Sequence, residues 1–188
     1  AVFRGDYHLD RAIDAALAIA DKGLGKPDRI VIETYADAVL FCDRPTPTDP
    51  AAARFSLQHA VAVALADGPP TLSGFETAVL VLPRYTVLRE ICEVIEDSAM
   101  TAAYPAHFGA RLRVTAQGSE TFVHIPDAWG DTENPMSADA IKTKFQMLAE
   151  AGGVDPSPLQ TAALDAQTGA YALRALLADL PALLKKED

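Results

Sequence analysis

Hydrophobic residues recur at helical spacing near the start of the chain. Leu9, Ile13 and Leu17 stand four positions apart, so they line one face of a helix. Gly23 follows the last apolar position and is typical of a helix C-cap. The pattern therefore predicts a helix over residues 9–22.

The later part of the chain shows strand and helix patterns in turn before it becomes wholly helical. Strands are predicted where apolar and polar residues alternate, and helices where apolar residues recur every three or four positions. The predicted elements are, in order, a strand at 29–35 that continues toward Phe41, a helix at 51–67, one or two helical turns at 84–90, a strand at 91–96, paired strands at 111–115 and 121–125, and helices at 137–151, from Ser157 and from Leu173. Caps and turns mark the boundaries at Asp49-Pro50, Gly68-Pro69-Pro70, Gln117-Gly118-Ser119, Ser137 and Gly152-Gly153.

This order of elements predicts an α+β fold. We expect a small mixed or antiparallel sheet that is covered by helices and followed by C-terminal helices. One domain is expected over residues 1–188, with an α+β core at 28–128 and the C-terminal helices at 137–185. Because the chain begins at Ala1, without Met, we also expect it to be a piece of a longer protein.

Composition and charge remove several classes of function. The 188 residues carry a formal net charge of −10, and the longest basic run is the pair Lys185-Lys186, so we expect no nucleic-acid partner. No apolar run reaches the roughly 20 residues of a membrane-spanning helix, so we expect no membrane partner. Cys42 and Cys92 each lie in or at the end of an apolar run, which predicts free buried thiols. That usage fits a cytoplasmic protein.

Four segments carry motifs in a fixed order. They are His8–Leu17, Ala53–Ala62 (which contains Arg-Phe-Ser-Leu-Gln-His), the dipeptide Tyr104-Pro105, and Gly130–Ser137 (Gly-Asp-Thr-Glu-Asn-Pro-Met-Ser) leading to Lys144-Phe145. Together they resemble the second domain of the MmgE/PrpD family, which includes 2-methylcitrate dehydratase, cis-aconitate decarboxylase and iminodisuccinate epimerase.

The resemblance implies a lyase or isomerase that acts on a small polycarboxylate without a cofactor. Such an enzyme would abstract a proton alpha to a carboxylate and then eliminate, decarboxylate or re-protonate. In the family, a preceding all-helical domain supplies most of the catalytic residues, and the second domain covers the cleft. We therefore expect an absent helical domain as a partner, and a homodimer. The alternative is a standalone binding or assembly domain that kept the fold and lost the chemistry.

His59 is the candidate catalytic residue that the resemblance points to. It stands where the family has a Tyr that reaches into the active-site cleft. An imidazole titrates near pH ~6.5 and a phenol near ~10, so His59 could donate or accept a proton at neutral pH. The helical spacing predicts that it shares a face with Phe55 and Val63. The alternative is a satisfied core or interface histidine.

Arg4 and His8 are the candidate substrate-binding residues. The family carries a catalytic Lys shortly before the His of the first motif, and here either that Lys is cut off or Arg4 stands in its place. An Arg would hold a carboxylate but could not act as a base. His8 could bind substrate, although a capping or surface role is the favoured interpretation.

Other polar residues are assigned structural roles. Arg111 and Arg113 share one face of a strand, where one could bind a carboxylate, but a solvated face that balances nearby Glu is the default. Residues 130–135 predict a shaped turn, and Asp131 and Glu133 lack further ligands at metal spacing. Since a glycine-rich nucleotide loop is also missing, we expect neither a metal nor a cofactor. His107 and His124 lie outside any motif.

Overall fold

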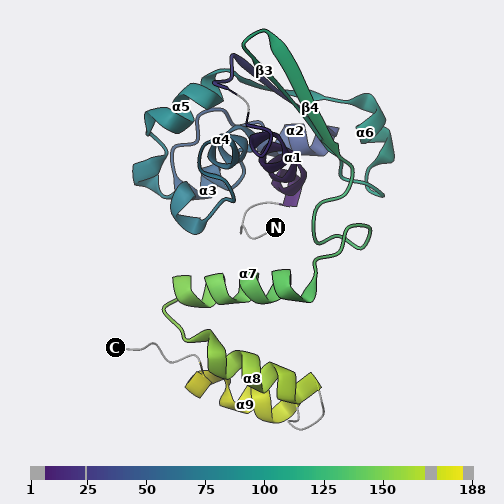
Figure 1. Cartoon of the computed structure of the whole chain (residues 1–188). Coiled ribbons are helices and arrows are strands. Elements are labelled where there is room, and N and C mark those ends of the chain that lie inside the picture. Colours follow the sequence, from purple (N-terminus) through teal and green to yellow (C-terminus); the bar gives the residue numbers. More distant parts are fainter. Residues whose placement is uncertain (1–6, 24, 168–172, 184–188) are drawn as a thin grey trace. The chain divides into compact units, whose positions relative to one another are not determined.

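A computed structural model shows the fold over residues 7–23, 25–167 and 173–183 (Figure 1). The chain divides into two compact units, Ala1–Pro135 and Met136–Asp188. The first unit contains a sheet with helices, and the second contains helices in all of its described elements. The predicted α+β class is confirmed.

A mixed four-stranded sheet organises the first unit. Its strands are β1 (Arg29–Thr34), β2 (Cys92–Glu96), β3 (Ala110–Ala116) and β4 (Ser119–Ile125). They lie in the order β2-β1-β3-β4. Strand β1 pairs in parallel with β2 and antiparallel with β3, and β3 pairs antiparallel with β4. The predicted hairpin is confirmed, because Gln117 and Gly118 join β3 to β4 with positive φ angles of 51° and 78°.

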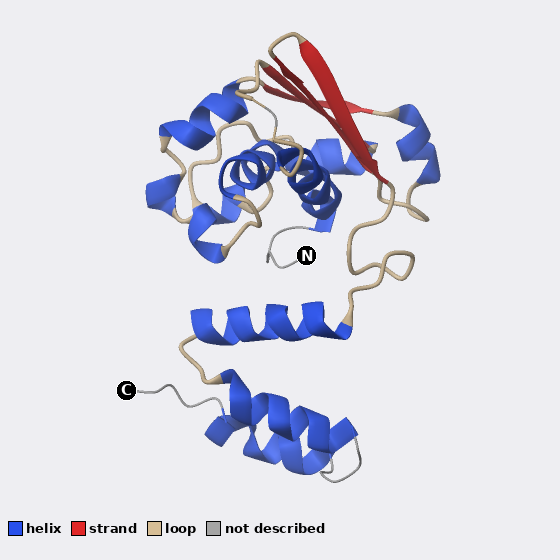
Figure 2. Cartoon of the chain, in the orientation of Figure 1, coloured by secondary structure: helices blue, strands red, loops and turns tan. Residues whose placement is uncertain are grey.

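Two helices cover one face of this sheet. Helix α1 (Asp10–Ala20) packs against β3 and β4, and α4 (Leu57–Asp67) packs against α1 and β2 (Figure 2). The core between these layers is fully buried and includes Ile19, Ile32, Leu57, Leu112 and Val114. Alternate residues of β3 are buried, which is the pattern of a strand with one face on a core.

Shorter helices complete the first unit. They are η1 (Tyr7–Leu9), α2 (Ala36–Cys42), α3 (Pro50–Ala53), η2 (Leu72–Phe75), η3 (Thr77–Val79), α5 (Pro83–Glu90) and α6 (Ser98–Ala103). The expected strand continuation toward Phe41 is wrong, because residues 36–42 form α2. Ala38 and Cys42 are buried four positions apart, whereas Leu40 and Phe41 are exposed, so burial here follows the helical period. Helix α6 was not predicted; Asp97 caps it by accepting bonds from the backbone N–H groups of its first turn.

The single helix expected at 51–67 is instead two helices. Asp49 caps α3 as predicted, and its side chain accepts from the backbone N–H of Ala52. The chain then leaves the helix at Arg54 and restarts at Leu57. Ser56 causes the restart: its hydroxyl accepts from the backbone N–H of His59 at 3.0 Å and donates to the carbonyl of Arg44 at 2.6 Å.

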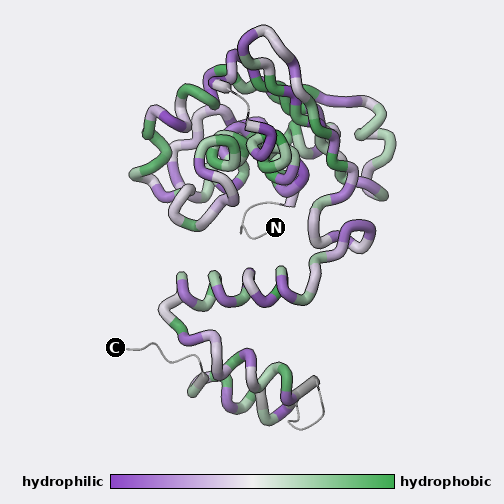
Figure 3. The backbone as a smooth tube through the Cα atoms, in the orientation of Figure 1, coloured by the Kyte–Doolittle hydropathy of each residue, from purple (hydrophilic) through white to green (hydrophobic). Residues whose placement is uncertain are grey.

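The second unit contains the helices α7 (Ala138–Ala151), α8 (Pro156–Gln167) and α9 (Leu173–Leu183). Ser137 caps α7 as predicted, accepting from the backbone N–H of Ala140 at 3.2 Å. Hydrophobic and hydrophilic positions alternate along the turns of α7 (Figure 3). In the part of the chain that the structure describes, no helix is both long and apolar enough to cross a membrane.

Candidate functional site

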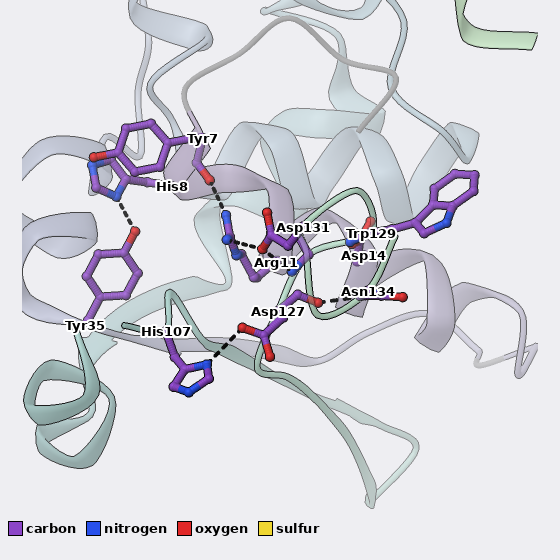
Figure 4. Close-up of polar contacts among 11 residues, drawn as sticks. Tyr7, His8, Arg11, Asp14, Tyr35, His107, Asp127, Trp129, Asp131 and Asn134 are labelled. Atoms are coloured by element: carbon purple, nitrogen blue, oxygen red, sulfur yellow. Dashed lines mark hydrogen bonds and ion pairs between the residues drawn. The ribbon is translucent and has the colours of Figure 1, made fainter. Parts of the chain in front are cut away.

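His8 lies in an aromatic cluster at the start of α1. Its Nδ1 atom is hydrogen-bonded to the hydroxyl of Tyr35, which stands at the end of β1 (Figure 4). The His8 ring lies 4.1 Å from the ring of Tyr7 and stacks with Phe41 at 6.1 Å between centroids. The expected capping or surface role is wrong, because His8 is buried and α1 begins after Leu9 without a side-chain cap. This bond could not be predicted from the sequence, because Tyr35 is 27 positions away and belongs to another element.

Tyr35 is itself held by a second layer of rings. Tyr104 stacks on it at 4.8 Å with an interplanar angle of 12°, and Phe108 meets it edge-on at 5.8 Å. Burial raises the pKa of Tyr35, so its phenol stays protonated at neutral pH. Sequence reasoning missed Tyr35 because a Tyr at the end of a strand carries no local signal of function.

Arg11 connects the first motif to the fourth. Its guanidinium forms an ion pair with Asp131 and donates from Nη1 to the carbonyl of Tyr7 at 3.1 Å (Figure 4). The guanidinium carbon also lies 4.9 Å above the ring of Phe108. The Arg11 side chain is only 5% exposed and that of Asp131 is 33% exposed. Such a buried cation is stabilised only by its partners, so this pair fixes the start of α1 to the turn that follows β4.

The turn at 127–134 is shaped by its own polar groups, as predicted for this segment. Asp131 also accepts from the backbone N–H of Ala128 at 2.9 Å, and Gly130, with a φ of 115°, donates to the carbonyl of Asn134 at 2.7 Å. Asp14 in α1 accepts from the backbone N–H of Trp129 at 2.8 Å. Burial raises the pKa of Asp14, and the bond from Trp129 opposes that rise.

His107 lies beside this turn on the surface. Its Nδ1 atom is 2.9 Å from a carboxylate oxygen of Asp127, and this hydrogen bond raises the pKa of His107. The pair is exposed on the His107 side, so it stabilises the protonated ring in contact with solvent. Sequence reasoning left His107 without a role, and Asp127 gave no sign of the contact.

His59 lies in helix α4 and is fully buried in the core. Its Nε2 atom is 2.9 Å from the carbonyl oxygen of Gly74, and its Nδ1 atom is 3.0 Å from a guanidinium nitrogen of Arg89. Because a carbonyl only accepts and a guanidinium only donates, Nε2 carries the proton and Nδ1 accepts. Phe75 and Tyr85 contact the ring edge-on, at 5.0 and 5.4 Å between centroids.

This environment keeps His59 neutral. Burial lowers its pKa to about 4, with a further lowering from the charge of Arg89, while the bond to Gly74 acts against both. The shared face with Phe55 is wrong: Phe55 precedes the start of α4 and is 40% exposed, whereas His59 is 0% exposed. These contacts fit the alternative of a satisfied core histidine. The catalytic role of His59 stays a prediction that its burial does not favour.

The other candidate residues of the sequence have different outcomes. Arg4 lies outside the described residues. Arg111 and Arg113 both pair with Glu33 across the β1–β3 register, so the expected charge balance on the sheet face is confirmed. Within the described ranges, no group of His, Cys, Asp and Glu side chains could hold a metal ion.

The two cysteines are not joined in a disulfide. Cys42 is buried as predicted, and Cys92 is partly buried. Burial raises the pKa of Cys92 to about 12, so its thiol is protonated at neutral pH.

The fold and the turn-to-helix contacts define an α+β domain followed by C-terminal helices, with buried His8 and Arg11 in η1 and α1 beside the 127–134 turn. A family model for the MmgE/PrpD C-terminal domain matches residues 5–163. The chain therefore belongs to the MmgE/PrpD family and contains its C-terminal domain. A comparison with curated proteins gives no significant match.

Proposed function

We propose that this chain is the substrate-covering domain of a cofactor-independent lyase or isomerase that acts on a small polycarboxylate. The match to the MmgE/PrpD C-terminal domain over residues 5–163 carries this proposal. The reaction would start with removal of a proton alpha to a carboxylate. Elimination, decarboxylation or re-protonation would follow.

The residues proposed to bind substrate are Arg4 and His8. They stand four positions apart in the sequence, and His8 follows Tyr7, whose backbone carbonyl accepts a hydrogen bond from Arg11. A guanidinium binds a carboxylate through two parallel hydrogen bonds, and it stays protonated throughout. Since the chain has a net charge of −10, a polyanionic substrate needs such a local cation.

The proposal includes partners that the described residues do not contain. An all-helical domain would supply the base that removes the proton, and the assembled enzyme would be a cytoplasmic homodimer. His59 is not needed in this scheme, because its two ring nitrogens are bonded to Gly74 and Arg89.

The test uses the full-length natural protein that contains these residues. Its turnover is measured with methylcitrate, cis-aconitate and iminodisuccinate. We expect one of them to be converted, and Arg4→Ala to raise KM by about tenfold or more, because a charge-assisted bond to a carboxylate is lost.

Arg29→Ala is the matched control. Arg29 lies at the start of β1 in the same unit, 65% exposed and paired with the exposed Glu93, so its loss should leave KM unchanged. A wild-type protein that binds a polycarboxylate in calorimetry without converting it would instead support the standalone binding domain. A KM that does not respond to Arg4→Ala would remove Arg4 from the site.

A further inference from the structure

We propose that Tyr35 is a positioning residue that fixes neutral His8 as the tautomer with its proton on Nε2. The inference deepens the proposed function and rests on it for the consequence in catalysis. The tautomer itself follows from the contacts around Tyr35, whatever reaction the protein performs.

The direction of the hydrogen bond is decided by what the Tyr35 hydroxyl can do. Tyr35 is 1% exposed. Among the described residues, its hydroxyl is hydrogen-bonded to Nδ1 of His8. A buried hydroxyl that does not donate leaves its proton unsatisfied, which costs more than an ordinary hydrogen bond contributes. The hydroxyl therefore donates and Nδ1 accepts.

An accepting nitrogen of an imidazole carries no proton. In the neutral ring the proton must then lie on Nε2, since one of the two nitrogens always holds it. The raised pKa of Tyr35 supports the same assignment, because a phenol that stays protonated stays a donor.

Tyr35 can impose this choice because it is held in place. Tyr104 stacks on one face of its ring, and Phe108 meets it edge-on. The backbone next to it is also fixed, since the N–H of Ala36 donates to the hydroxyl of Thr101 at 3.0 Å. A group whose ring and backbone are both restrained keeps its hydroxyl aimed at His8, which is the condition for positioning another residue.

The tautomer decides which chemistry His8 can contribute. A protonated Nε2 donates a hydrogen bond to a carboxylate or to an enolate-like oxygen, and it does not remove a proton from carbon. Arg4 likewise can only donate. This domain would therefore bind and stabilise negative charge, and the base would come from the helical partner domain.

The direct test is nuclear magnetic resonance of the full-length protein labelled with 15N in its histidines. Spectra are recorded at about pH 8, where an ordinary imidazole is neutral, and His8 is assigned from the signal lost in His8→Gln. We expect an unprotonated Nδ1 and a protonated Nε2. In Tyr35→Phe the two nitrogen shifts should move toward those of a tautomer mixture.

Tyr104→Phe is the matched control, because it keeps the ring that stacks on Tyr35 and removes a different hydroxyl. The His8 shifts should not change in that variant. A wild-type His8 protonated on Nδ1, or shifts that do not respond to Tyr35→Phe, would overturn the assignment.

Activity provides an independent readout. With whichever polycarboxylate the wild type converts, Tyr35→Phe should lower kcat/KM by about tenfold, the loss of one hydrogen bond, at a temperature where its unfolding curve shows the variant still folded. An unchanged kcat/KM would overturn the positioning role. If the wild type converts none of the substrates, the proposed function fails, while the 15N shifts still decide the tautomer.

Discussion

Acid should unfold the first unit partly through His59, and the structure sets the size of the effect. His59 is 0% exposed, and its pKa is lowered to about 4 by burial. In the unfolded chain the same ring titrates near ~6.5, so between these values the unfolded state binds the proton and the folded state does not. The contribution of His59 to stability is therefore complete above pH ~6.5 and is lost as the pH falls toward ~4.

The magnitude follows from the two pKa values. Through His59 alone, the free energy of unfolding should be about 2 kcal/mol lower at pH ~5 than at pH ~7.5. The physical origin is the transfer of a charged ring into the core, where it would also face the guanidinium of Arg89, 3.0 Å away. Carboxylates elsewhere in the chain titrate over the same range, so the wild-type curve by itself cannot isolate His59.

Comparison with His59→Gln isolates the contribution of His59 to the free energy of unfolding. An amide can still accept from Arg89 and donate to the carbonyl of Gly74, but it does not titrate. Urea unfolding of both proteins at about pH 7.5 and 5, followed by the fluorescence of the single Trp129, gives the difference in their free energies of unfolding. That difference should shift by about 2 kcal/mol in favour of the variant at the lower pH.

His107→Gln is the control with the opposite sign. The bond to Asp127 raises the pKa of His107, so this residue contributes stability below its ordinary titration range, and that stability is lost as the pH rises through the folded-state value. The free energy of unfolding of the wild type should therefore rise relative to that of His107→Gln as the pH falls. A difference between wild type and His59→Gln that does not change with pH, or that changes in the direction of the control, would refute the burial argument.

Two further perturbations test the packing of the site and the turn chemistry. Asp131→Asn leaves Arg11 buried without a full counter-charge and should cost about 2 kcal/mol in urea unfolding; a loss below about 0.5 kcal/mol would show that solvent already screens the pair. Gly118→Ala should cost about 1 kcal/mol in thermal unfolding because its φ is 78°, although a Cβ there meets no neighbour. Gly118→Asn should cost less, because Asn adopts this region more readily, and equal losses would point away from the backbone angle.

Local signals predicted many of the elements correctly. Three features illustrate this: the Ser137 cap, the Gln117-Gly118 turn and the apolar face of α1. Each depends on residues only a few positions apart, so the local sequence is enough to predict it. The same local reasoning failed at 36–42. Leu40 and Phe41 suit a strand as well as a helix, and only the burial of Ala38 and Cys42 on one side distinguishes the two.

Two of the four motifs meet in the structure. The motif around His8 lies at the start of α1, and the Gly130–Ser137 segment contains the shaped turn that was predicted there. Neither pattern indicated that the two would meet, because Arg11 and Asp131 are 120 positions apart in the sequence. His59 shows the reverse: its motif suggested a cleft, and the contacts with Gly74 and Arg89 place it in the core.

The sequence alone determined the fold class and the family. Those properties depend on periodicity, caps and motif order, which act over a few residues at a time. The tertiary structure decided which nitrogen of His8 accepts, which carboxylate faces Arg11, and whether His59 meets solvent. Each of these depends on a partner from a distant element, and packing of the whole core selects that partner.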